Sequence, residues 1–318
     1  MKIAVLDDYA GVALAMADWA SLGAEITVFH DTITDRAQLI ARLEPFDVIC
    51  LMRERTPMDA ALINALANLK LIVTTGPRNA SVDVAAARAR QIPVSGTESR
   101  ATQTAEFAML MILALNRHLM PEVASLNAGG WQAGLGRDLA GLTLGVIGLG
   151  RLGGQMAALG KAFGMEVVAW SQNLTEARAA ELGVRRIGSL TDLMAMSDVA
   201  SVHLVLSGRT EGLIDATALA ASKPGLVLIN TSRGQIVDTD ALLAGLRVGK
   251  PARAGIDVYD QEPLPADHPL RDAELIADGR LLLTPHLAYA TEATFRLFYE
   301  QTVQAIRAYL DGAPIRLL

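Results

Sequence analysis

The chain has 318 residues, 51% of them hydrophobic, and its 28 Lys and Arg against 34 Asp and Glu give a formal net charge of −6. That length suits two domains, each able to bury a core of its own. The acidic balance, without any dense run of basic residues, argues against a nucleic-acid partner and against an anionic-membrane partner.

The first hundred residues alternate between short apolar runs and stretches rich in Ala and Leu. This alternation predicts βαβ units on a parallel sheet, and strands that are apolar throughout are expected where both sheet faces are covered. The predicted strands are 3–6, 26–29, 48–51 and 71–75, and the predicted helices are 12–22, 36–43, 59–66 and 82–90.

Two features of this first stretch bear on the compartment. The opening MKIAVLDDY turns acidic too early for a signal peptide, and no apolar run in the chain reaches the roughly 18 residues of a membrane span. The single cysteine, Cys50, sits in an apolar run and is expected to be a buried thiol. We therefore expect a cytoplasmic protein.

The rest of the chain repeats the alternation after a helix over 102–117 and a Gly-rich loop over 127–136. Strands are predicted at 142–147, 166–170, 199–204, 226–230, 253–258 and 281–284, and helices at 152–163, 239–248 and 291–310. The predicted fold class is α/β, with two doubly wound parallel-sheet domains, Rossmann-like or flavodoxin-like, and a cleft between them.

A glycine fingerprint opens the second half. Gly148, Gly150 and Gly153 have G-x-G-x-x-G spacing after an apolar strand and before an Ala-rich helix, which is the context that supports dinucleotide binding. Gly148 permits the tight turn, Gly150 allows close approach of a pyrophosphate, and Gly153 allows the helix to pack on the strand.

The choice of cofactor stays open at this point. The fingerprint predicts an acidic residue ~20 residues on, to bind the ribose 2′-hydroxyl of NAD. That place holds Ser171, followed by Gln172 and Asn173, so neither a carboxylate for NAD nor an Arg for NADP stands there. Either NAD or NADP is therefore possible.

Three polar residues follow predicted strands of the second half. They are Arg233, Glu262 and His286, and parallel topology brings the strand ends to one sheet edge. Arg matches a carboxylate with a charged fork, His moves a proton near neutral pH, and a carboxylate beside His favours the imidazolium. Each type alone is commonly structural, but together they predict reduction of a 2-oxo acid.

The motifs resemble those of the D-isomer-specific 2-hydroxyacid dehydrogenases over nearly the whole length. They are TAEFAMLMILALNR, LTLGVIGLGRLG, VHLVL, LINTSRGQIVD, DVYDQEPLP and TPHLAYAT. The resemblance implies a substrate domain of 1–100 plus 287–318, an NAD(P)-binding Rossmann domain of 101–286, and a homodimer.

The resemblance also implies residue roles. Arg233 would hold the substrate carboxylate, and His286 would be the acid/base paired with Glu262. Asp257 would face the nicotinamide carboxamide, while the backbone N–H groups of Arg151 and Leu152 would meet the pyrophosphate. The substrate would be a small 2-oxo or 2-hydroxy acid.

The substrate domain departs from the family pattern. A Gly-containing loop usually grips the carboxylate, but here TTGPRNASVD keeps Gly76 and follows it with Pro77, which lacks an N–H, and Arg78. Arg53 follows the third strand and is expected at the same place. These residues suggest a substrate with a second anionic or polar group.

Other functions compete with this interpretation. A dinucleotide-sensing corepressor-like protein with little turnover is the alternative from another class. Among enzymes, a formate-oxidising protein is disfavoured because that branch has Gln where this chain has Glu262. Glyoxylate/hydroxypyruvate-reductase-like and phosphoglycerate-dehydrogenase-like activities stay open, although an extra regulatory domain is not expected in a chain ending at Leu318.

Overall fold

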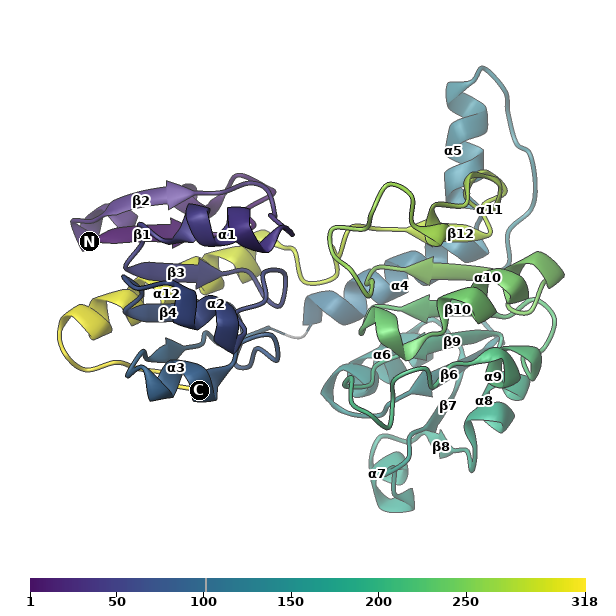
Figure 1. The fold of residues 1–318 in the computed structure, drawn as a ribbon. Coiled ribbons are helices and arrows are strands. Elements are labelled where there is room, and N and C mark those ends of the chain that lie inside the picture. The colour runs from purple at the N-terminus through teal and green to yellow at the C-terminus, as the bar shows by residue number, and fades with distance from the viewer. Residues whose placement is uncertain (101) are drawn as a thin grey trace. The chain divides into compact units, whose positions relative to one another are not determined.

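The computed structural model describes residues 1–100 and 102–318, which form two compact α/β units. The first unit joins Met1–Arg100 to Ala290–Leu318, and the second is the continuous stretch Ala101–Tyr289. Ala101, the first residue of the predicted cofactor domain, lies outside the described residues. Each unit has a parallel sheet with helices around it (Figure 1), which confirms the predicted fold class.

The first unit is built on a five-stranded sheet in the order β2-β1-β3-β4-β5, with every pair parallel. Its strands are β1 (Lys2–Val5), β2 (Glu25–Val28), β3 (Val48–Leu51), β4 (Leu71–Thr74) and β5 (Val94–Ser95). All four residues of β3 and of β4 are buried, which explains their unbroken apolar sequence. Burial raises the pKa of the Cys50 thiol in β3, so this cysteine is a packing residue.

Aspartates begin the short helices of this unit. Asp35, Asp59 and Asp83 each accept a hydrogen bond from a backbone N–H of the first turn, which satisfies one of the unpaired donors there. The helices are α1 (Arg36–Leu43), α2 (Ala60–Ala65), α3 (Val84–Ala89) and, from the distant C-terminal segment, α12 (Glu292–Leu310).

The predicted helix over 12–22 is wrong. The chain forms two 3-10 turns instead, η1 (Ala13–Ala15) and η2 (Trp19–Leu22). The Asp8 carboxylate accepts from the N–H groups of Val12 and Ala13, and the Trp19 indole donates to the Ala13 carbonyl at 2.8 Å. These side-chain bonds compete with the α-helical pattern, so local capping overrides helix propensity.

The second unit is built on a seven-stranded sheet in the order β12-β11-β10-β9-β6-β7-β8, again parallel throughout. Its strands are β6 (Thr143–Ile147), β7 (Glu166–Trp170), β8 (Arg185–Arg186), β9 (Val199–Val202), β10 (Val227–Asn230), β11 (Arg253–Ile256) and β12 (Leu281–Leu283). Its helices are α4 (Thr102–Asn116), α5 (Leu119–Asn127), α6 (Arg151–Ala162), α7 (Glu176–Glu181), α8 (Leu190–Met196), α9 (Ala216–Ala220), α10 (Thr239–Val248) and α11 (Ala273–Ala277), with 3-10 turns η3 (Gly234–Ile236) and η4 (Pro269–Arg271).

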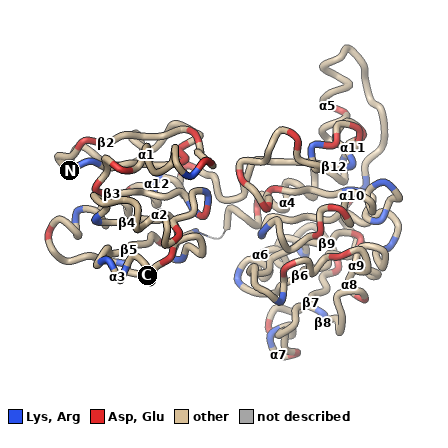
Figure 2. The backbone as a smooth tube through the Cα atoms, viewed as in Figure 1, with Lys and Arg blue, Asp and Glu red and all other residues tan. Residues whose placement is uncertain are grey.

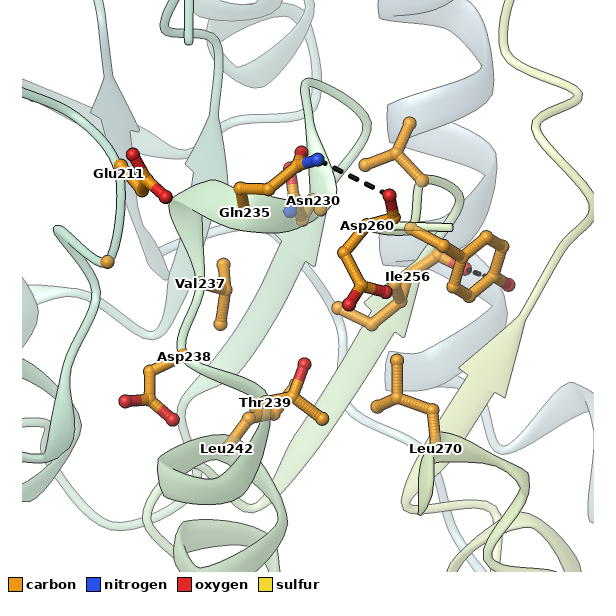
Figure 3. Close-up of a pocket in the computed structure, with 14 residues that line it drawn as sticks. Glu211, Asn230, Gln235, Val237, Asp238, Thr239, Leu242, Ile256, Asp260 and Leu270 are labelled. Atoms are coloured by element: carbon orange, nitrogen blue, oxygen red, sulfur yellow. Dashed lines mark hydrogen bonds between the residues drawn. The ribbon is translucent and has the colours of Figure 1, made fainter. Parts of the chain in front are cut away.

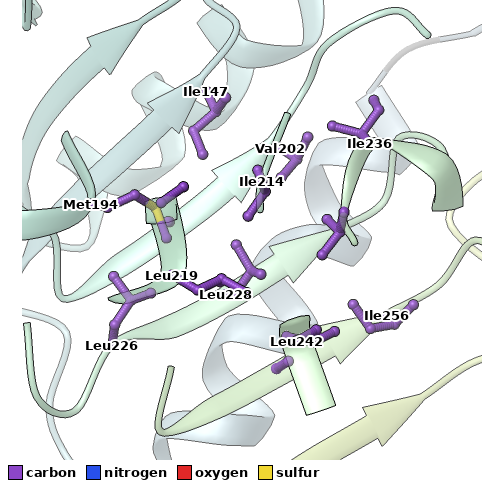
Figure 4. Packing of buried hydrophobic residues seen from close by; sticks show 14 of the residues in the cluster. Ile147, Met194, Val202, Ile214, Leu219, Leu226, Leu228, Ile236, Leu242 and Ile256 are labelled. Carbon is purple, nitrogen blue, oxygen red and sulfur yellow. The ribbon is translucent and has the colours of Figure 1, made fainter. Parts of the chain in front are cut away.

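Hydrophobic side chains cover both faces of this sheet. In β10, Leu228 belongs to one buried cluster while its neighbours Val227 and Ile229 belong to another. Figure 4 shows the first cluster, in which strand residues such as Leu228 and Ile256 lie against Leu219 and Leu242 of the covering helices. Because both faces of the sheet are packed, polar functional residues are expected at the carboxyl ends of the strands.

Charged residues of both signs are spread along the backbone trace of the described residues (Figure 2). Lys and Arg are interleaved with Asp and Glu in both units (Figure 2). Over the described residues, no helix combines the length and apolar character that crossing a membrane requires.

Candidate active site

Three neighbouring strands of the second unit deliver the predicted catalytic residues. In the register of the sheet, Asn230 of β10 lies beside Ile256 of β11, which lies beside Leu283 of β12. Arg233, Glu262 and His286 each follow one of these strands within a few residues. The structure therefore places all three at the carboxyl edge of adjacent strands.

His286 and Glu262 are in direct contact. His286 Nδ1 lies 2.6 Å from Glu262 Oε2, and the two side chains are only 16% and 18% exposed. The other carboxylate oxygen of Glu262 accepts from the Tyr259 N–H at 3.1 Å. Nδ1 is thereby occupied, which leaves Nε2 as the ring nitrogen available for proton exchange.

The His286 backbone is held in a rare conformation. Its φ is +53°, in the left-handed region that residues with side chains seldom adopt. Its ring meets the Tyr289 ring edge-on, with centroids 5.2 Å apart. These constraints orient the imidazole from both its backbone and its side chain.

Asp257 holds the loop that carries His286 through hydrogen bonds. It is fully buried, its Oδ1 accepts from Thr284 Oγ1 at 2.6 Å and from the Leu287 N–H at 2.7 Å, and its Oδ2 accepts from the Ala288 N–H at 2.9 Å. Burial raises the pKa of Asp257, while those three donors and the nearby imidazole oppose the rise. Asp257 thus fixes the residues on both sides of His286, and its predicted contact with the nicotinamide carboxamide stays a prediction.

The Arg233 loop is packed against the loop that carries Glu262. A side chain at Gly234 would come within 2.3 Å of the Tyr259 backbone, so only glycine allows this approach. Asn230 Nδ2 donates to the Arg233 carbonyl at 2.9 Å, and Arg233 Nη1 donates to the Ser232 carbonyl at 2.7 Å. This arrangement ties the guanidinium to the same sheet edge as the His286–Glu262 pair.

The glycine loop has the conformation that its sequence predicts. Gly148 has φ +103° and its N–H donates to the Trp170 carbonyl at the end of β7. A Cβ at Gly153 would meet the Gly148 carbonyl oxygen at 1.9 Å, whereas one at Gly150 would meet nothing within 4 Å. Gly153 therefore serves helix packing, and Gly150 faces open space in front of α6.

These residues fit a dinucleotide. Helix α6 begins at Arg151 and Leu152 without a side-chain cap, so its first N–H groups are left for an anion. The open space at Gly150 is where a pyrophosphate would approach. Past β10, the buried Thr231 hydroxyl has no hydrogen-bond partner in the described chain, which is the state expected of a group kept for a ligand.

A cavity of about 350 Å³ lies beside Ser171, at the end of β7. Trp170, Ser171, Gln172 and Asn173 line one side of it, and the segment after β9 supplies Arg209. Spacing from the glycine fingerprint points only to the three residues that follow β7, so Arg209 was not predicted. In the sheet, β9 and β7 flank β6 on either side, so the loops that follow them lie at the same sheet edge.

A second cavity, of about 260 Å³, lies beside the turn η3 (Figure 3). Gln235, Val237 and Asp238 line it, and Gln235 Nε2 donates to the Asp260 carbonyl at 3.4 Å. None of the residues lining it is a predicted site residue. It therefore adds nothing to the predicted chemistry.

His203 is the other histidine next to the glycine loop. Its Nε2 lies 2.9 Å from Ser201 Oγ, and desolvation lowers the pKa of His203 to about 4. It is therefore neutral at neutral pH, and its contact with Ser201 is that of a structural residue. It follows β9 rather than lying inside that strand.

In the first unit, Arg53 and Gly76 follow the paired strands β3 and β4 and lie together. A Cβ on Gly76, which has φ +91°, would sit 1.9 Å from Arg53 Nη1, so the absent side chain makes room for the guanidinium. The Gly76 N–H already donates to Thr97 Oγ1 at 2.7 Å. The predicted use of that N–H in substrate binding therefore competes with an internal hydrogen bond.

Arg78 differs from Arg53 in its surroundings. Arg53 Nη1 donates to the Thr75 carbonyl at 3.3 Å, and Nη2 lies 3.7 Å from Glu54. Arg78 is exposed, and no hydrogen bond or ion pair links its guanidinium to the described part of the chain. Among these residues, Arg78 is the cation best placed to meet an outside anion.

Comparison with known proteins identifies the family of the chain. The model of the "D-isomer specific 2-hydroxyacid dehydrogenase, NAD binding domain" matches residues 109–288, which is more than half of the chain and most of the second unit. The chain belongs to the D-isomer-specific 2-hydroxyacid dehydrogenase family. Its second unit carries the NAD-binding domain of that family.

Curated relatives extend the similarity to both units. The chain is 36% identical over 302 residues to a D-3-phosphoglycerate dehydrogenase of Mycobacterium leprae, covering 94% of this chain and 56% of the relative. It thus spans about half the length of that enzyme. It is also 36% identical over 265 residues to a glyoxylate reductase of Aeropyrum pernix, covering 80% of this chain and 77% of the relative.

A solved structure shows the same fold. The chain matches the crystal structure of a phosphoglycerate oxidoreductase from Vibrio cholerae O395 with a TM-score of 0.91 and 35% identity. The match covers 98% of this chain and 100% of the other. The two-unit fold is therefore that of a 2-hydroxyacid dehydrogenase throughout.

Proposed function

We propose that this protein is an NAD(P)-dependent D-2-hydroxyacid dehydrogenase, which interconverts a small 2-hydroxy acid and its 2-oxo acid. The observation that carries the proposal is the 2.6 Å contact between His286 and Glu262 at the carboxyl edge of the sheet. That pair supplies a proton donor within the domain that the family uses to bind NAD. Glyoxylate, hydroxypyruvate and 3-phosphoglycerate-like acids are the candidate substrates, after the relatives' names.

The proposed mechanism divides the work among three side chains. Arg233 binds the substrate carboxylate with its planar fork and polarises the adjacent carbonyl. His286 donates the proton from Nε2 to the carbonyl oxygen, and Glu262 stabilises the imidazolium that this requires. In the reverse direction His286 takes the proton from the hydroxyl.

The cofactor would be held by the glycine loop. Gly148, Gly150 and Gly153 shape the loop, and the N–H groups of Arg151 and Leu152 would meet the pyrophosphate. The hydride is the chemistry that a bound nicotinamide supplies. Asp257 acts as a positioning residue for His286 through its bonds to Leu287 and Ala288.

The first unit is proposed to serve as the substrate domain, with Arg53, Gly76 and Arg78 as its binding residues. The exposed guanidinium of Arg78 supports a substrate with a second anionic or polar group. Arg78→Ala is expected to raise KM by about tenfold for dicarboxylic 2-oxo acids and to spare monocarboxylic ones. Equal losses on both classes would overturn the second-anion proposal.

A panel of 2-oxo acids assayed with NADH and NADPH tests the activity. We expect turnover with at least one acid, and a loss of about 10²- to 10⁴-fold in kcat for His286→Asn. His268→Asn is the matched control, because His268 also neighbours a carboxylate, Asp260 at 3.3 Å. Tight dinucleotide binding without turnover across the panel would contradict the proposal.

Assembly and compartment belong to the same proposal. We expect a homodimer, supported by the apolar residues that α5 exposes, and a cytoplasmic location, supported by a single buried cysteine.

A further inference from the structure

We propose that the second unit prefers NADP(H) to NAD(H), with the 2′-phosphate held between Arg209 and Ser171. This inference rests on the dinucleotide site of the proposed function and names the cofactor for it. It depends on the residues around the cavity at the end of β7, which come from two separate loops.

The first observation is the chemistry of the cavity lining. Where NAD is preferred, a carboxylate in this place binds the ribose diol and repels a 2′-phosphate. None of the residues lining this cavity is acidic, and Ser171, Gln172 and Asn173 present hydroxyl and amide donors instead. The lining therefore lacks the group that would exclude NADP.

The second observation is the placement of Arg209. Gln172 Nε2 donates to the Arg209 carbonyl at 3.1 Å, which joins this loop to the end of β7. Next to it, the buried Thr210 hydroxyl donates to the Val205 carbonyl at 2.8 Å and accepts from the Ser207 N–H at 2.8 Å. These bonds fix the backbone that carries Arg209 at the rim of the cavity.

The third observation concerns the ion pairs around Arg209. Its guanidinium is exposed, and no ion pair engages it within residues 1–100 and 102–318. The two glutamates of the nearby helix α7 are already paired, Glu176 with Arg186 and Glu181 with Arg178. Arg209 is thus available for a phosphate, which its planar fork can bind through two hydrogen bonds.

The remaining lining residues suit the adenine. Leu204, Val205 and Leu213 form an apolar wall of the cavity, and Val205 is 84% exposed without a ligand. The flat ring face of adenine would cover that surface. The cavity therefore combines an apolar side for the base with a cationic side for the 2′-phosphate.

Measuring dinucleotide binding directly tests the cofactor preference independently of catalytic turnover. NADPH and NADH are titrated without any 2-oxo acid, following the quenching of tryptophan fluorescence, since Trp170 lines the cavity. The fragments 2′,5′-ADP and 5′-AMP are then compared by calorimetry, because they differ in the 2′-phosphate alone. We expect the wild type to bind the 2′-phosphorylated member of each pair at least about tenfold more tightly.

Substitutions test which residues cause the difference in affinity between NADPH and NADH. Arg209→Ala is expected to weaken NADPH by about tenfold or more and NADH by less than about twofold. Ser171→Asp should reverse the preference, because a carboxylate then faces the ribose. Arg178→Ala, a partly exposed arginine that lies outside the cavity lining, is the control and should leave both affinities unchanged.

Several outcomes would overturn the inference. Equal weakening of NADPH and NADH in Arg209→Ala would place the guanidinium on the adenine rather than on the phosphate. A wild type that binds both dinucleotides equally, or favours NADH, would refute the preference itself. A 2′-phosphate preference without any turnover would sink the proposed function alone, whereas failure to bind either dinucleotide would sink both.

Discussion

Glu262 uses its two carboxylate oxygens on different partners, His286 and the Tyr259 backbone. Glu262→Gln keeps the shape but removes the negative charge that favours the imidazolium. We expect kcat for 2-oxo-acid reduction to fall by at least about tenfold, and the alkaline fall of kcat/KM to begin at lower pH. Measuring kcat/KM from pH 5 to 9 tests this.

The pH profile also separates positioning from charge. If Glu262 only oriented the ring, the glutamine would lower kcat without moving the profile along the pH axis. An unmoved profile would therefore contradict a role for the Glu262 charge. A profile that moves to lower pH supports it.

His203 predicts a pH dependence of stability. Its pKa is lowered to about 4 in the folded chain, against about 6.5 when unfolded, so the unfolded state binds the proton more tightly. The contribution of neutral His203 to the free energy of unfolding is fully present above about pH 6.5 and is lost as the pH falls toward about 4. The loss is at most about 3 kcal/mol. Urea unfolding of the wild type and of His203→Gln at pH 7.5 and 5 measures it.

The glutamine variant cannot take up the proton, so it should lose less stability than the wild type on acidification. The test compares the change in the free energy of unfolding between pH 7.5 and 5 in the two proteins. The contributions of the other titrating groups are common to both proteins and cancel. Parallel losses in the two proteins would show that His203 does not carry this dependence.

At the scale of single residues, spacing and topology predicted which side chains meet. The sequence placed Arg233, Glu262 and His286 after adjacent strands, and the structure brings His286 into contact with Glu262. Arg209 was not found, since it lies 38 positions after Ser171 and reaches the cavity only through the sheet order. Contacts made by long loops depend on how the sheet is ordered, which spacing alone does not encode.

At the scale of elements, two glycines of the glycine loop have different roles, one in helix packing and one in ligand approach. A Cβ at Gly153 would collide with the Gly148 carbonyl oxygen, while a Cβ at Gly150 would enter open space. We expect Gly153→Ala to lower the free energy of unfolding by about 1–3 kcal/mol. Gly150→Ala should cost less than about 1 kcal/mol but weaken dinucleotide binding by about tenfold or more.

Unfolding in urea and fluorescence titration of each variant distinguish the two effects. A Gly150→Ala protein that is as unstable as Gly153→Ala would contradict the division of labour. Unchanged dinucleotide affinity in Gly150→Ala would contradict the pyrophosphate position.

The elements that the sequence predicted best are the buried strands, because their apolar runs are bounded by turns. Among the elements that were predicted wrongly or missed, two have a local explanation. Side-chain capping by Asp8 divides the expected helix over 12–22, and α5 was missed because Pro121 obscures a helical pattern. That proline stands in the first turn of α5, where a missing N–H costs nothing.

At the scale of the whole molecule, α5 leaves apolar side chains uncovered. The exposed members of α5 and of the segment after it are Leu119, Met120, Val123, Leu126, Trp131 and Leu135. Exposed apolar side chains are a common feature of protein–protein interfaces. We expect a dimer in sedimentation at micromolar concentration, and dissociation at least about tenfold easier for Val123→Glu.

The control for this prediction is the same substitution elsewhere. Val248 is 78% exposed at the end of α10, so Val248→Glu tests whether any added charge disturbs assembly. A monomeric wild type, or equal dissociation of both variants, would contradict a role for α5.

The late helix α12 has a consequence for how the protein is made. It packs on β4 of the first unit, and its buried Tyr299 meets Trp19 with ring centroids 6.0 Å apart. A ribosome adding about 5–20 residues per second delivers the whole of the second unit between those partners. The sheet of the first unit therefore exposes apolar surface for roughly 10 to 40 seconds before α12 is synthesised. A chaperone that binds exposed apolar surface would act on this chain in that interval.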